Sequence, residues 1–317
     1  MQSGAGAGST IPDSAFAAVG AKIVPDAATV YKDSHVVLKV RAPTEAEVKS
    51  MQPEALLVSF VYAARNPELV KALESSNVTS MAYELVPRTT KGQAMDALSA
   101  MANIAGYRAV VEAGHLFNRI LGGQITAAGK VAPSKILIIG GGVAGLAAAA
   151  QARAMGAIVR IFDTRAAVEE QAKSLGADFL KVNVQESGDG GGGYAKEMSD
   201  AYKAAQAELF AKQCKEVDII ITTALIPGKP APKLFSKAMV DSMKPGSVIM
   251  DLAAEAGGNC ELTVPGKVRV LWLWPFFPWP APPHLPNAPP PPHPSPPNFT
   301  NPTGHPTAQQ HVDRGLH

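Results

Sequence analysis

The 317-residue chain has few of the features that mark disulfide-rich, metal-binding or membrane-spanning proteins. It has two cysteines, Cys214 and Cys260, and no C-x-x-C motif, so neither a disulfide framework nor a zinc site is expected. No apolar run reaches the roughly 18 residues that cross a bilayer, and the N-terminus lacks the basic and apolar regions of a signal peptide. The formal net charge of +2, without a basic stripe, argues against nucleic-acid binding.

The chain is nevertheless rich enough in apolar residues to fold. A hydrophobic content of 46% over this length is sufficient for two cores of ordinary size, and the length predicts about two domains. We expect an α/β protein with two Rossmann-like domains built on parallel sheets. The second is expected to be a doubly wound dinucleotide-binding domain, followed by a disordered proline-rich tail.

Residues 1–126 alternate strand and helix patterns and predict a first α/β domain with a connecting helix. Strands are expected at 36–40, 56–61 and 78–83. Thr44 and Glu47 have capping-box spacing, and Asn66 precedes Pro67 as an N-cap precedes the first helical residue. The alanine-rich stretch 94–117 is predicted to be the connecting helix.

A glycine motif opens the second domain, expected over residues 127–270. Residues 135–139 form a short apolar run typical of a buried parallel strand, and Gly140, Gly142 and Gly145 follow with G-x-G-x-x-G spacing. The first glycine permits a tight turn, the second admits a pyrophosphate, and the third lets the helix at 144–155 pack against the strand. This order predicts a dinucleotide site at a helix N-terminus.

An acidic residue ends the next predicted strand, at 158–162. A carboxylate at Asp163 can accept hydrogen bonds from both ribose hydroxyls of NAD, and it would repel the 2′-phosphate of NADP. Arg165 complicates this assignment, because an arginine nearby can accommodate the 2′-phosphate. Since the residue directly after the strand is acidic, the pattern favours NAD.

Two further segments are candidates for contact with a nucleotide. Gly190 to Gly193 and Tyr194 are typical either of a lid or of a flexible connection. Thr223 and Ala224 follow the predicted strand at 217–222, at the carboxyl end of a central strand where ligands bind in parallel sheets.

The composition changes abruptly in the last 47 residues, 271–317, which hold 15 of the 27 prolines, all three tryptophans and five of the seven histidines. Proline fixes φ and removes a backbone donor, so disorder with polyproline character is expected. The tail is either a ligand for a proline-recognition domain or an aberrant C-terminus. Its histidines lack metal-ligand spacing, so no metal site is assigned.

Several motifs resemble one known family. They are VPRTTKGQAMDALSAMANIAGYRAV at 86–110, GQITAAGKVAPSKILIIGGGVAGLAA, GYAKEMSDA and DIIITTALIPGKPAPKL. The sequence closely resembles the NAD(H)-binding component of proton-translocating NAD(P) transhydrogenase, the N-terminal part of its alpha subunit, in the alanine dehydrogenase/transhydrogenase superfamily. The resemblance covers most of residues 3–268.

The resemblance implies a fold, an activity and partners. It implies two α/β domains, a homodimer, and hydride transfer from NADH to NADP+ held on a partner domain, coupled to proton movement through a membrane domain. The component would be peripheral to an energy-transducing membrane: the mitochondrial inner membrane on its matrix side or the bacterial plasma membrane on its cytoplasmic side. Relative to the family, the chain is expected to lack the first strand-helix-strand unit and to diverge after Val268, leaving an exposed sheet edge.

The resemblance also assigns residues. Arg88, Gln93, Asp96 and Ser99 would form the catalytic loop that holds the nicotinamide end, and Tyr194 would close over the nucleotide. From the residues alone, the pattern favours a helix-capping ion pair between Arg88 and Asp96, with no ligand. The full set of expected cofactor-binding residues is Gly140, Gly142, Val143, Gly145, Asp163, Thr164, Arg165, Tyr194, Thr223 and Ala224.

Direct hydride transfer between two nicotinamides needs no acid, base or nucleophile, only two rings held close with water excluded. The missing Ser/His/Asp and Cys/His constellations therefore fit this activity. Two alternatives remain open. One is an alanine-dehydrogenase-like enzyme that reduces a keto acid, and the other is a catalytically inactive, truncated NAD-binding remnant.

Overall fold

The computed structural model describes residues 1–86, 89, 91–184, 186, 188, 198–225 and 230–268, with the side chain of Gln93 excepted. The predicted proline-rich tail at 271–317 and the glycine run at 190–193 lie outside these residues.

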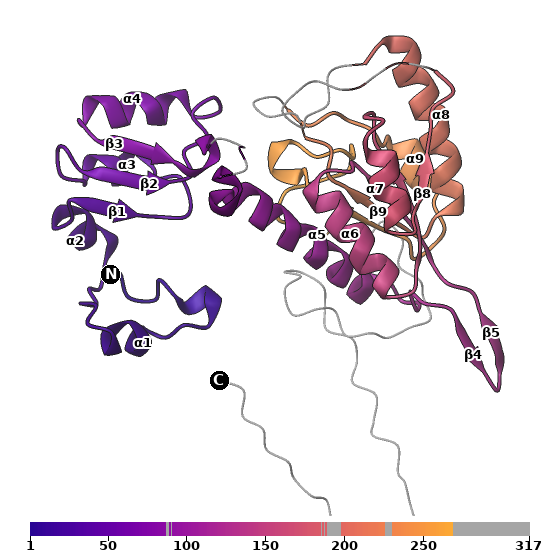
Figure 1. Cartoon of the computed structure of the whole chain (residues 1–317), viewed down its shortest axis with the longest axis horizontal. Coiled ribbons are helices and arrows are strands. Elements are labelled where there is room, and N and C mark those ends of the chain that lie inside the picture. The colour runs from indigo at the N-terminus through magenta and orange to yellow at the C-terminus, as the bar shows by residue number, and fades with distance from the viewer. Residues whose placement is uncertain are drawn as a thin grey trace, which may run out of the picture. The chain divides into compact units, whose positions relative to one another are not determined.

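The second domain is built on a sheet of five parallel strands in the order β10-β9-β6-β7-β8. Figure 1 labels two of these strands, β8 and β9. Its strands are β6 (Lys135–Ile139), β7 (Ile158–Phe162), β8 (Asp178–Leu180), β9 (Ile219–Thr222) and β10 (Val248–Asp251). The strand order reverses between β6 and β9, which are adjacent in the sheet although they are far apart in the sequence. This arrangement confirms the predicted α/β class and the doubly wound parallel sheet.

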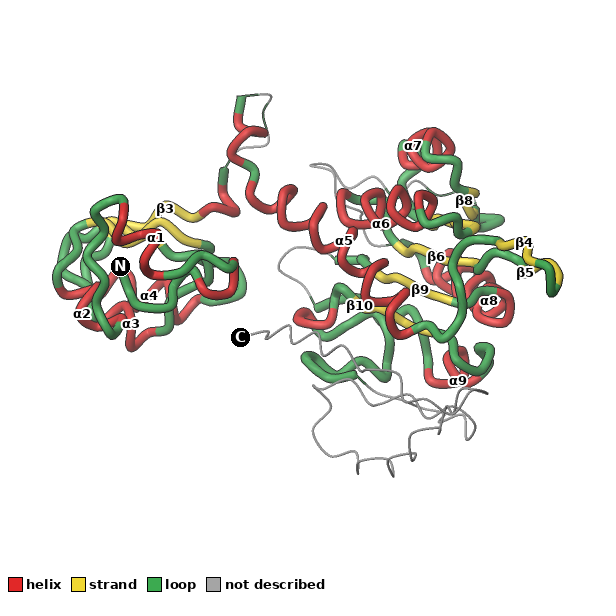
Figure 2. The backbone as a smooth tube through the Cα atoms, turned by 90° about the horizontal axis from the view of Figure 1, so that it is seen from below, coloured by secondary structure: helices red, strands yellow, loops and turns green. Residues whose placement is uncertain are grey.

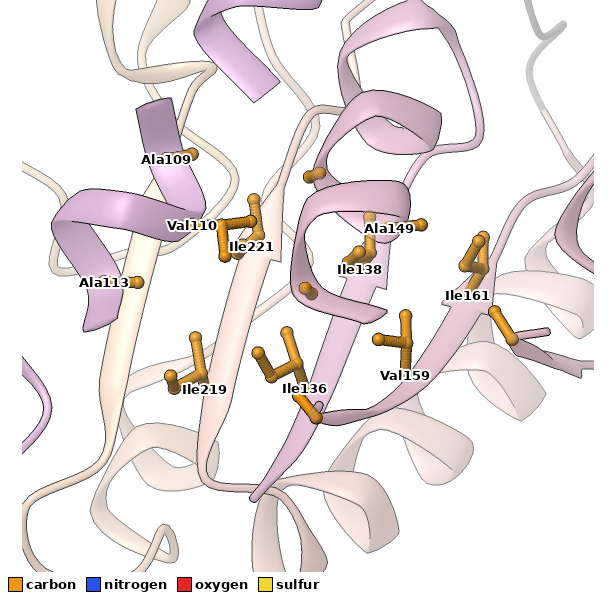
Figure 3. Close-up of a cluster of buried hydrophobic side chains, with 14 of the residues drawn as sticks. Ala109, Val110, Ala113, Ile136, Ile138, Ala149, Val159, Ile161, Ile219 and Ile221 are labelled. Atoms are coloured by element: carbon orange, nitrogen blue, oxygen red, sulfur yellow. The ribbon is translucent and has the colours of Figure 1, made fainter. Parts of the chain in front are cut away.

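Helices cover both faces of this sheet (Figure 2). The strands are apolar on both sides because successive side chains point to opposite faces. Ile136 and Ile138 face a core shared with α5, α6 and α7, of which Figure 3 shows a part. Leu137 and Ile139 face a second core, shared with α8 and α9. These helices are α5 (Ala97–Leu116), α6 (Val143–Ala154), α7 (Val168–Ser174), α8 (Asp200–Glu216) and α9 (Lys237–Asp241).

Helices α5 and α6 approach each other closely through small residues. Ala109 and Ala113 of α5 and Ala149 of α6 belong to the same buried cluster (Figure 3). A Cβ on Gly106 would overlap the carbonyl oxygen of Ala144. The helix predicted as a connector is therefore packed into the core of the second domain over much of its length.

The first domain has a sheet of three parallel strands, β1 (Val36–Leu38), β2 (Leu56–Ser59) and β3 (Thr79–Ala82), in that order. One face packs against α2 (Ala27–Lys32), α3 (Glu45–Lys49) and α4 (Pro67–Ser75), with side chains such as Val37, Val48 and Leu57 in the core. On the opposite face, Leu38 is 73% exposed and Met81 is 60% exposed.

The remaining elements are short. A two-stranded antiparallel hairpin spans the predicted domain boundary in the sequence. It is formed by β4 (Gln124–Thr126) and β5 (Gly129–Val131), it was not predicted, and its strand residues are all exposed. The others are α1 (Asp13–Ala18), η1 (Ala7–Ser9), η2 (Tyr83–Leu85), η3 (Gly92–Met95) and η4 (Ala254–Ala256).

Local capping signals were largely informative. Thr44 and Glu47 form the predicted capping box at the start of α3. Asn66 precedes Pro67 at the first turn of α4, but its side chain donates to the carbonyl of Val61 and caps no helical amide. The connecting helix begins three residues later than predicted, because Asp96 caps it by accepting a hydrogen bond from the amide of Ser99.

Candidate functional site

The turn after β6 lies between the carboxyl ends of its two neighbouring strands. The Gly140 amide donates to the Phe162 carbonyl at the end of β7, and the Thr223 amide beyond β9 donates to the Ile139 carbonyl, both at 2.8 Å. Gly140 has φ +97°, which a residue with a side chain rarely adopts, and a Cβ there would overlap the Thr223 hydroxyl. The turn therefore occupies the switch point of the sheet, where ligands bind in this class of fold.

The other two glycines of the motif meet different requirements. A Cβ on Gly145 would overlap the carbonyl oxygen of Gly140, so the first turn of α6 can approach the strand only without a side chain there. Gly142 is the N-cap of α6, and a Cβ on it would meet no atom within 4 Å. The absence of a side chain at Gly142 leaves open space next to the helix N-terminus.

The N-terminus of α6 suits a pyrophosphate. The first amides of an α-helix have no intrahelical acceptor, and no side chain of the N-cap residue caps this helix. The residue at its first position, Val143, is 40% exposed, so the end of the helix is accessible. Open space at Gly142, the first helical amides and the dipole of a 12-residue helix together fit an anionic group, and a dinucleotide supplies one.

Asp163 follows β7 directly and is joined to the glycine turn. Its Oδ2 accepts a hydrogen bond from the Gly141 amide at 2.7 Å. Its Oδ1 accepts from the amide of Arg165 at 2.8 Å, and the Arg165 guanidinium contacts both oxygens, at 2.9 and 2.8 Å. The Asp163 side chain is 6% exposed and that of Arg165 is 16% exposed. The carboxylate is thus held against the glycine turn at the carboxyl end of β7.

Thr164 contributes a buried hydroxyl. Among the described residues, its Oγ1 has no hydrogen-bond partner. A Cβ on Gly188 would overlap the Thr164 side chain, so the backbone of Gly188 lies close to Thr164. The Gly188 amide donates to the Thr164 carbonyl at 3.1 Å.

Thr223 and Ala224 are fixed by polar contacts that sequence reasoning missed. The Thr223 hydroxyl donates to the carbonyls of Ile139 and Gly140. Asn259 is fully buried and pairs with both backbone groups of Ala224: its Oδ1 accepts from the amide at 3.1 Å and its Nδ2 donates to the carbonyl at 2.9 Å. A third bond goes from Asn259 Nδ2 to the carbonyl of Pro232 at 2.9 Å.

Asp251, at the end of β10, holds Asn259 in turn. Its Oδ2 accepts from the amides of Asn259 and Cys260 and from the hydroxyl of Thr263, while its Oδ1 accepts from the hydroxyl of Thr222. The ends of β9 and β10 and the segment at 259–263 are therefore linked by one polar network. Only the clustering of Asp251, Asn259 and Thr263 near the end of an apolar strand could have suggested it from the sequence.

Of the four residues expected to form the catalytic loop, the structure brings two together. Asp96 Oδ1 accepts from the Ser99 amide at 3.0 Å and Oδ2 from the Ser99 hydroxyl at 2.7 Å, so this pair caps α5. Gln93 lies in η3, but its side chain is outside the described residues. Arg88 and Tyr194 are also outside them.

The two cysteine thiols are buried in the same core as Leu137 and Ile139. Burial, and then the neighbouring Cys260, raise the pKa of Cys214 to about 11, so it carries no reactive thiolate near neutral pH. Among the residues that the structure describes, no group of three or more His, Cys, Asp or Glu side chains could hold a metal ion, and no helix is long and apolar enough to span a membrane.

Comparison with known families decides the classification. The model for the alanine dehydrogenase/PNT N-terminal domain matches residues 1–105, and the model for the alanine dehydrogenase/PNT C-terminal domain matches residues 109–271. The chain belongs to the alanine dehydrogenase/PNT family. This confirms the resemblance drawn from the motifs, and the glycine turn and Asp163 both fall within the C-terminal family domain.

Within this family, transhydrogenases are more similar to the chain than an alanine dehydrogenase is. The chain is 55% identical over 264 residues to NAD(P) transhydrogenase subunit alpha of Haemophilus influenzae, covering 83% of this chain and 51% of that protein. It is 49% identical over 269 residues to NAD(P) transhydrogenase subunit alpha of Cereibacter sphaeroides, covering 84% and 51%. Alanine dehydrogenase of Mycolicibacterium smegmatis is 35% identical over 266 residues, covering 82% and 65%.

A solved structure gives the same result. The transhydrogenase from Sinorhizobium meliloti matches with a TM-score of 0.70 and 42% identity, covering 82% of this chain and 70% of that one. This chain spans about half the length of the subunit alpha relatives from Haemophilus influenzae and Cereibacter sphaeroides.

Proposed function

We propose that this chain is the NAD(H)-binding component of a proton-translocating NAD(P) transhydrogenase. It would bind NAD(H) at the turn after β6 and transfer hydride from NADH to NADP+ held on a separate domain. The observation that carries the proposal is the glycine turn at the switch point, in a chain whose 55% identical relative is named NAD(P) transhydrogenase subunit alpha.

The residues at the carboxyl ends of β6, β7 and β9 support a binding role. The amides at the start of α6 would hold the pyrophosphate, and Asp163 the adenosine ribose. Thr223 and Ala224, clamped by Asn259, would form the wall on the opposite side of the turn. These groups bind and orient, and NADH itself supplies the hydride.

Arg88, Gln93, Asp96 and Ser99 remain the proposed catalytic loop, and Tyr194 its proposed cover. The Asp96 and Ser99 pair fixes the start of α5, and α5 is packed on α6 through Gly106. The start of α5 is therefore connected to the glycine turn through the contact between α5 and α6.

The partners proposed are an NADP(H)-binding domain, a membrane domain and a second copy of this chain. The β4–β5 hairpin supports the homodimer, because a lone two-stranded hairpin is marginally stable in water, and its Ile125 is 86% exposed. Attachment to such a membrane domain would make the chain peripheral to an energy-transducing membrane. We propose domain limits of 1–126 and 127–270.

The test mixes the purified chain with a separately produced NADP(H)-binding domain of a transhydrogenase and measures NADH-dependent reduction of NADP+. Calorimetric titrations with NADH and NADPH come first, and the chain is expected to bind NADH more tightly. An Asp163→Asn variant, which keeps the shape but loses the charge, is expected to weaken NADH binding by about 1–3 kcal/mol.

Other outcomes would contradict the proposal. Tighter binding of NADPH than of NADH would contradict the assignment of this site to NAD(H). Oxidation of NADH that depends on pyruvate and ammonia, without a second protein, would favour the alanine dehydrogenase reaction. A native chain whose melting temperature does not respond to NADH would be an inactive remnant, since a ligand bound by the folded state raises the melting temperature by mass action.

A further inference from the structure

The carboxylate of Asp163 has a complete set of hydrogen-bond donors from the protein itself. Each oxygen accepts one backbone amide, Gly141 on Oδ2 and Arg165 on Oδ1. Each oxygen also accepts one guanidinium N–H of Arg165, Nη2 on Oδ2 at 2.8 Å and Nε on Oδ1 at 2.9 Å. A carboxylate has about four lone-pair positions, and all four are used here.

The two kinds of donor differ in how freely they can move. The Gly141 amide is part of a packed turn, since a Cβ on this glycine would overlap Val168. The Arg165 amide belongs to the backbone only two residues after Asp163, so it also has little freedom to move. The guanidinium sits at the end of a flexible side chain. If it turns away, one acceptor position opens on each oxygen while both backbone bonds remain. Two neighbouring acceptor positions match the two adjacent hydroxyls of a ribose.

We propose that Arg165 is a specificity-determining latch: its guanidinium occupies the ribose-binding edge of Asp163 and must turn away before the diol of a nucleotide binds. This inference rests on the proposed function, because it presumes that the ribose of a dinucleotide reaches Asp163. For NAD, opening the latch is a cost that lowers affinity. For NADP, the displaced guanidinium lies beside the 2′-position and can pair with the phosphate, which offsets the cost.

The latch therefore reduces the ratio by which the chain binds NADH more tightly than NADPH. Its removal has opposite effects on the two coenzymes: NADH binds more tightly because no ion pair has to be broken, and NADPH binds more weakly because the 2′-phosphate loses its cation. A purely structural role for Arg165 would weaken both together.

The test measures dissociation constants of the full chain for NADH and NADPH by calorimetry, and also for ADP-ribose and its 2′-phosphate, which lack the nicotinamide. In an Arg165→Gln variant, NADH and ADP-ribose are expected to bind about 3- to 10-fold more tightly and the 2′-phosphorylated ligands about 10-fold more weakly. Arg165→Lys keeps the charge but cannot pair with both oxygens of Asp163. This variant is expected to bind NADH more tightly than the native chain does, and to lose less NADPH affinity than Arg165→Gln does.

Arg160→Gln is the matched control. Arg160 is on β7, its side chain is 18% exposed, and its guanidinium pairs with Glu216 and Gln213. It is therefore a largely buried arginine of the strand that leads to Asp163, with its charge directed to other partners. Its substitution is expected to leave the ratio of the two dissociation constants unchanged. Thermal melts establish that each variant is folded.

The outcomes separate the two proposals. If the native chain binds NADH but Arg165→Gln shifts both coenzymes in the same direction, or shifts neither by more than about twofold, the latch is wrong and the proposed function stands. If the native chain binds neither coenzyme, both are wrong.

Discussion

The two parallel sheets in the described part of the chain differ in how many of their faces are buried. The five-stranded sheet is covered on both sides, and its central strands β6 and β9 are buried throughout apart from the partly buried Lys135. In the three-stranded sheet, β1 alternates between exposed and buried residues, and Leu38 and Met81 remain exposed on the same face. Parallel strands are normally buried on both faces. Among the described residues, helices therefore cover both faces of the sheet in the second domain but only one face of the sheet in the first.

The largest effect is expected where the second sheet meets α6. Gly145→Ala forces a Cβ into the Gly140 carbonyl and should cost at least about 3 kcal/mol of unfolding free energy. Gly142 lies three residues away, where an added Cβ would meet open space. Gly142→Ala should therefore lower the unfolding free energy by no more than about 1 kcal/mol, but it should weaken NADH binding. Urea unfolding followed by circular dichroism and NADH titration separate the two effects. Equal losses of stability would contradict the packing argument.

The comparison of the sheets is sharpened by truncating matched leucines. Leu57 is fully buried and Leu38 is exposed on the adjacent strand, so Leu57→Ala should cost about 2–5 kcal/mol and Leu38→Ala less than about 0.5. Ile138→Ala in the second domain should resemble Leu57→Ala. Urea unfolding of the three variants measures the differences. A loss of several kcal/mol for Leu38→Ala would mean that this face is covered in solution.

The polar network provides the next test. Asn259→Ala leaves three backbone groups of Ala224 and Pro232 without their partner and should cost about 2–3 kcal/mol, with weaker NADH binding. Asn66→Ala in the first domain loses a single hydrogen bond and should cost about 1 kcal/mol. Unfolding free energies and NADH titrations of both variants measure this. Unchanged NADH affinity in the folded Asn259 variant would show that the clamp on Ala224 is purely structural.

The smallest effect concerns charge in the first domain. Burial acts to raise the pKa of Glu47, but hydrogen bonds from Lys39, the Thr44 amide and Tyr31 outweigh it and lower the pKa from 4.5 to about 2. The stability that this carboxylate contributes is therefore fully present above pH 4.5 and is lost as the pH falls toward 2. Glu47→Gln keeps the capping box but not the ion pair, and should cost about 1 kcal/mol at pH 7.

The measurement for this variant is the urea midpoint between pH 7 and pH 2.5, followed by hydrogen exchange in α3 and β2. The native chain should lose more stability over this range than Glu47→Gln. Glu45→Gln, in the first turn of the same helix, is the control. If both variants retain the acid sensitivity of the native chain, Glu47 is not its source.

The parts of the fold that sequence analysis predicted depend on neighbours along the chain. The bounds of β6 and β7, the capping box of α3 and the glycine turn are set by residues within a few positions of one another. The α5–α6 approach at Gly106 and the β4–β5 hairpin were missed. A glycine inside an alanine-rich helix gives no sign of the helix that packs on it, and residues 124–131 have no strong strand pattern.

The candidate site divides in the same way. Gly140, Gly145 and Asp163 could be named from spacing alone, because the dinucleotide motif is local. Asn259 could not, since its partner Ala224 is 35 residues away. The sequence shows only that Asp163 and Arg165, which have opposite charges, are two residues apart. The four hydrogen bonds to the carboxylate also need the Gly141 amide, which the folded turn brings to it.

The sequence by itself determined the family, the parallel α/β class and the position of the phosphate turn, because glycine spacing and strand periodicity act through short stretches of backbone. The tertiary structure alone decided which faces of the sheets are buried and which side chains stabilise the loop after β9. It also decided which groups donate hydrogen bonds to the carboxylate of Asp163 at the end of β7. Those outcomes depend on groups far apart in the chain, and only folding brings them within hydrogen-bonding distance.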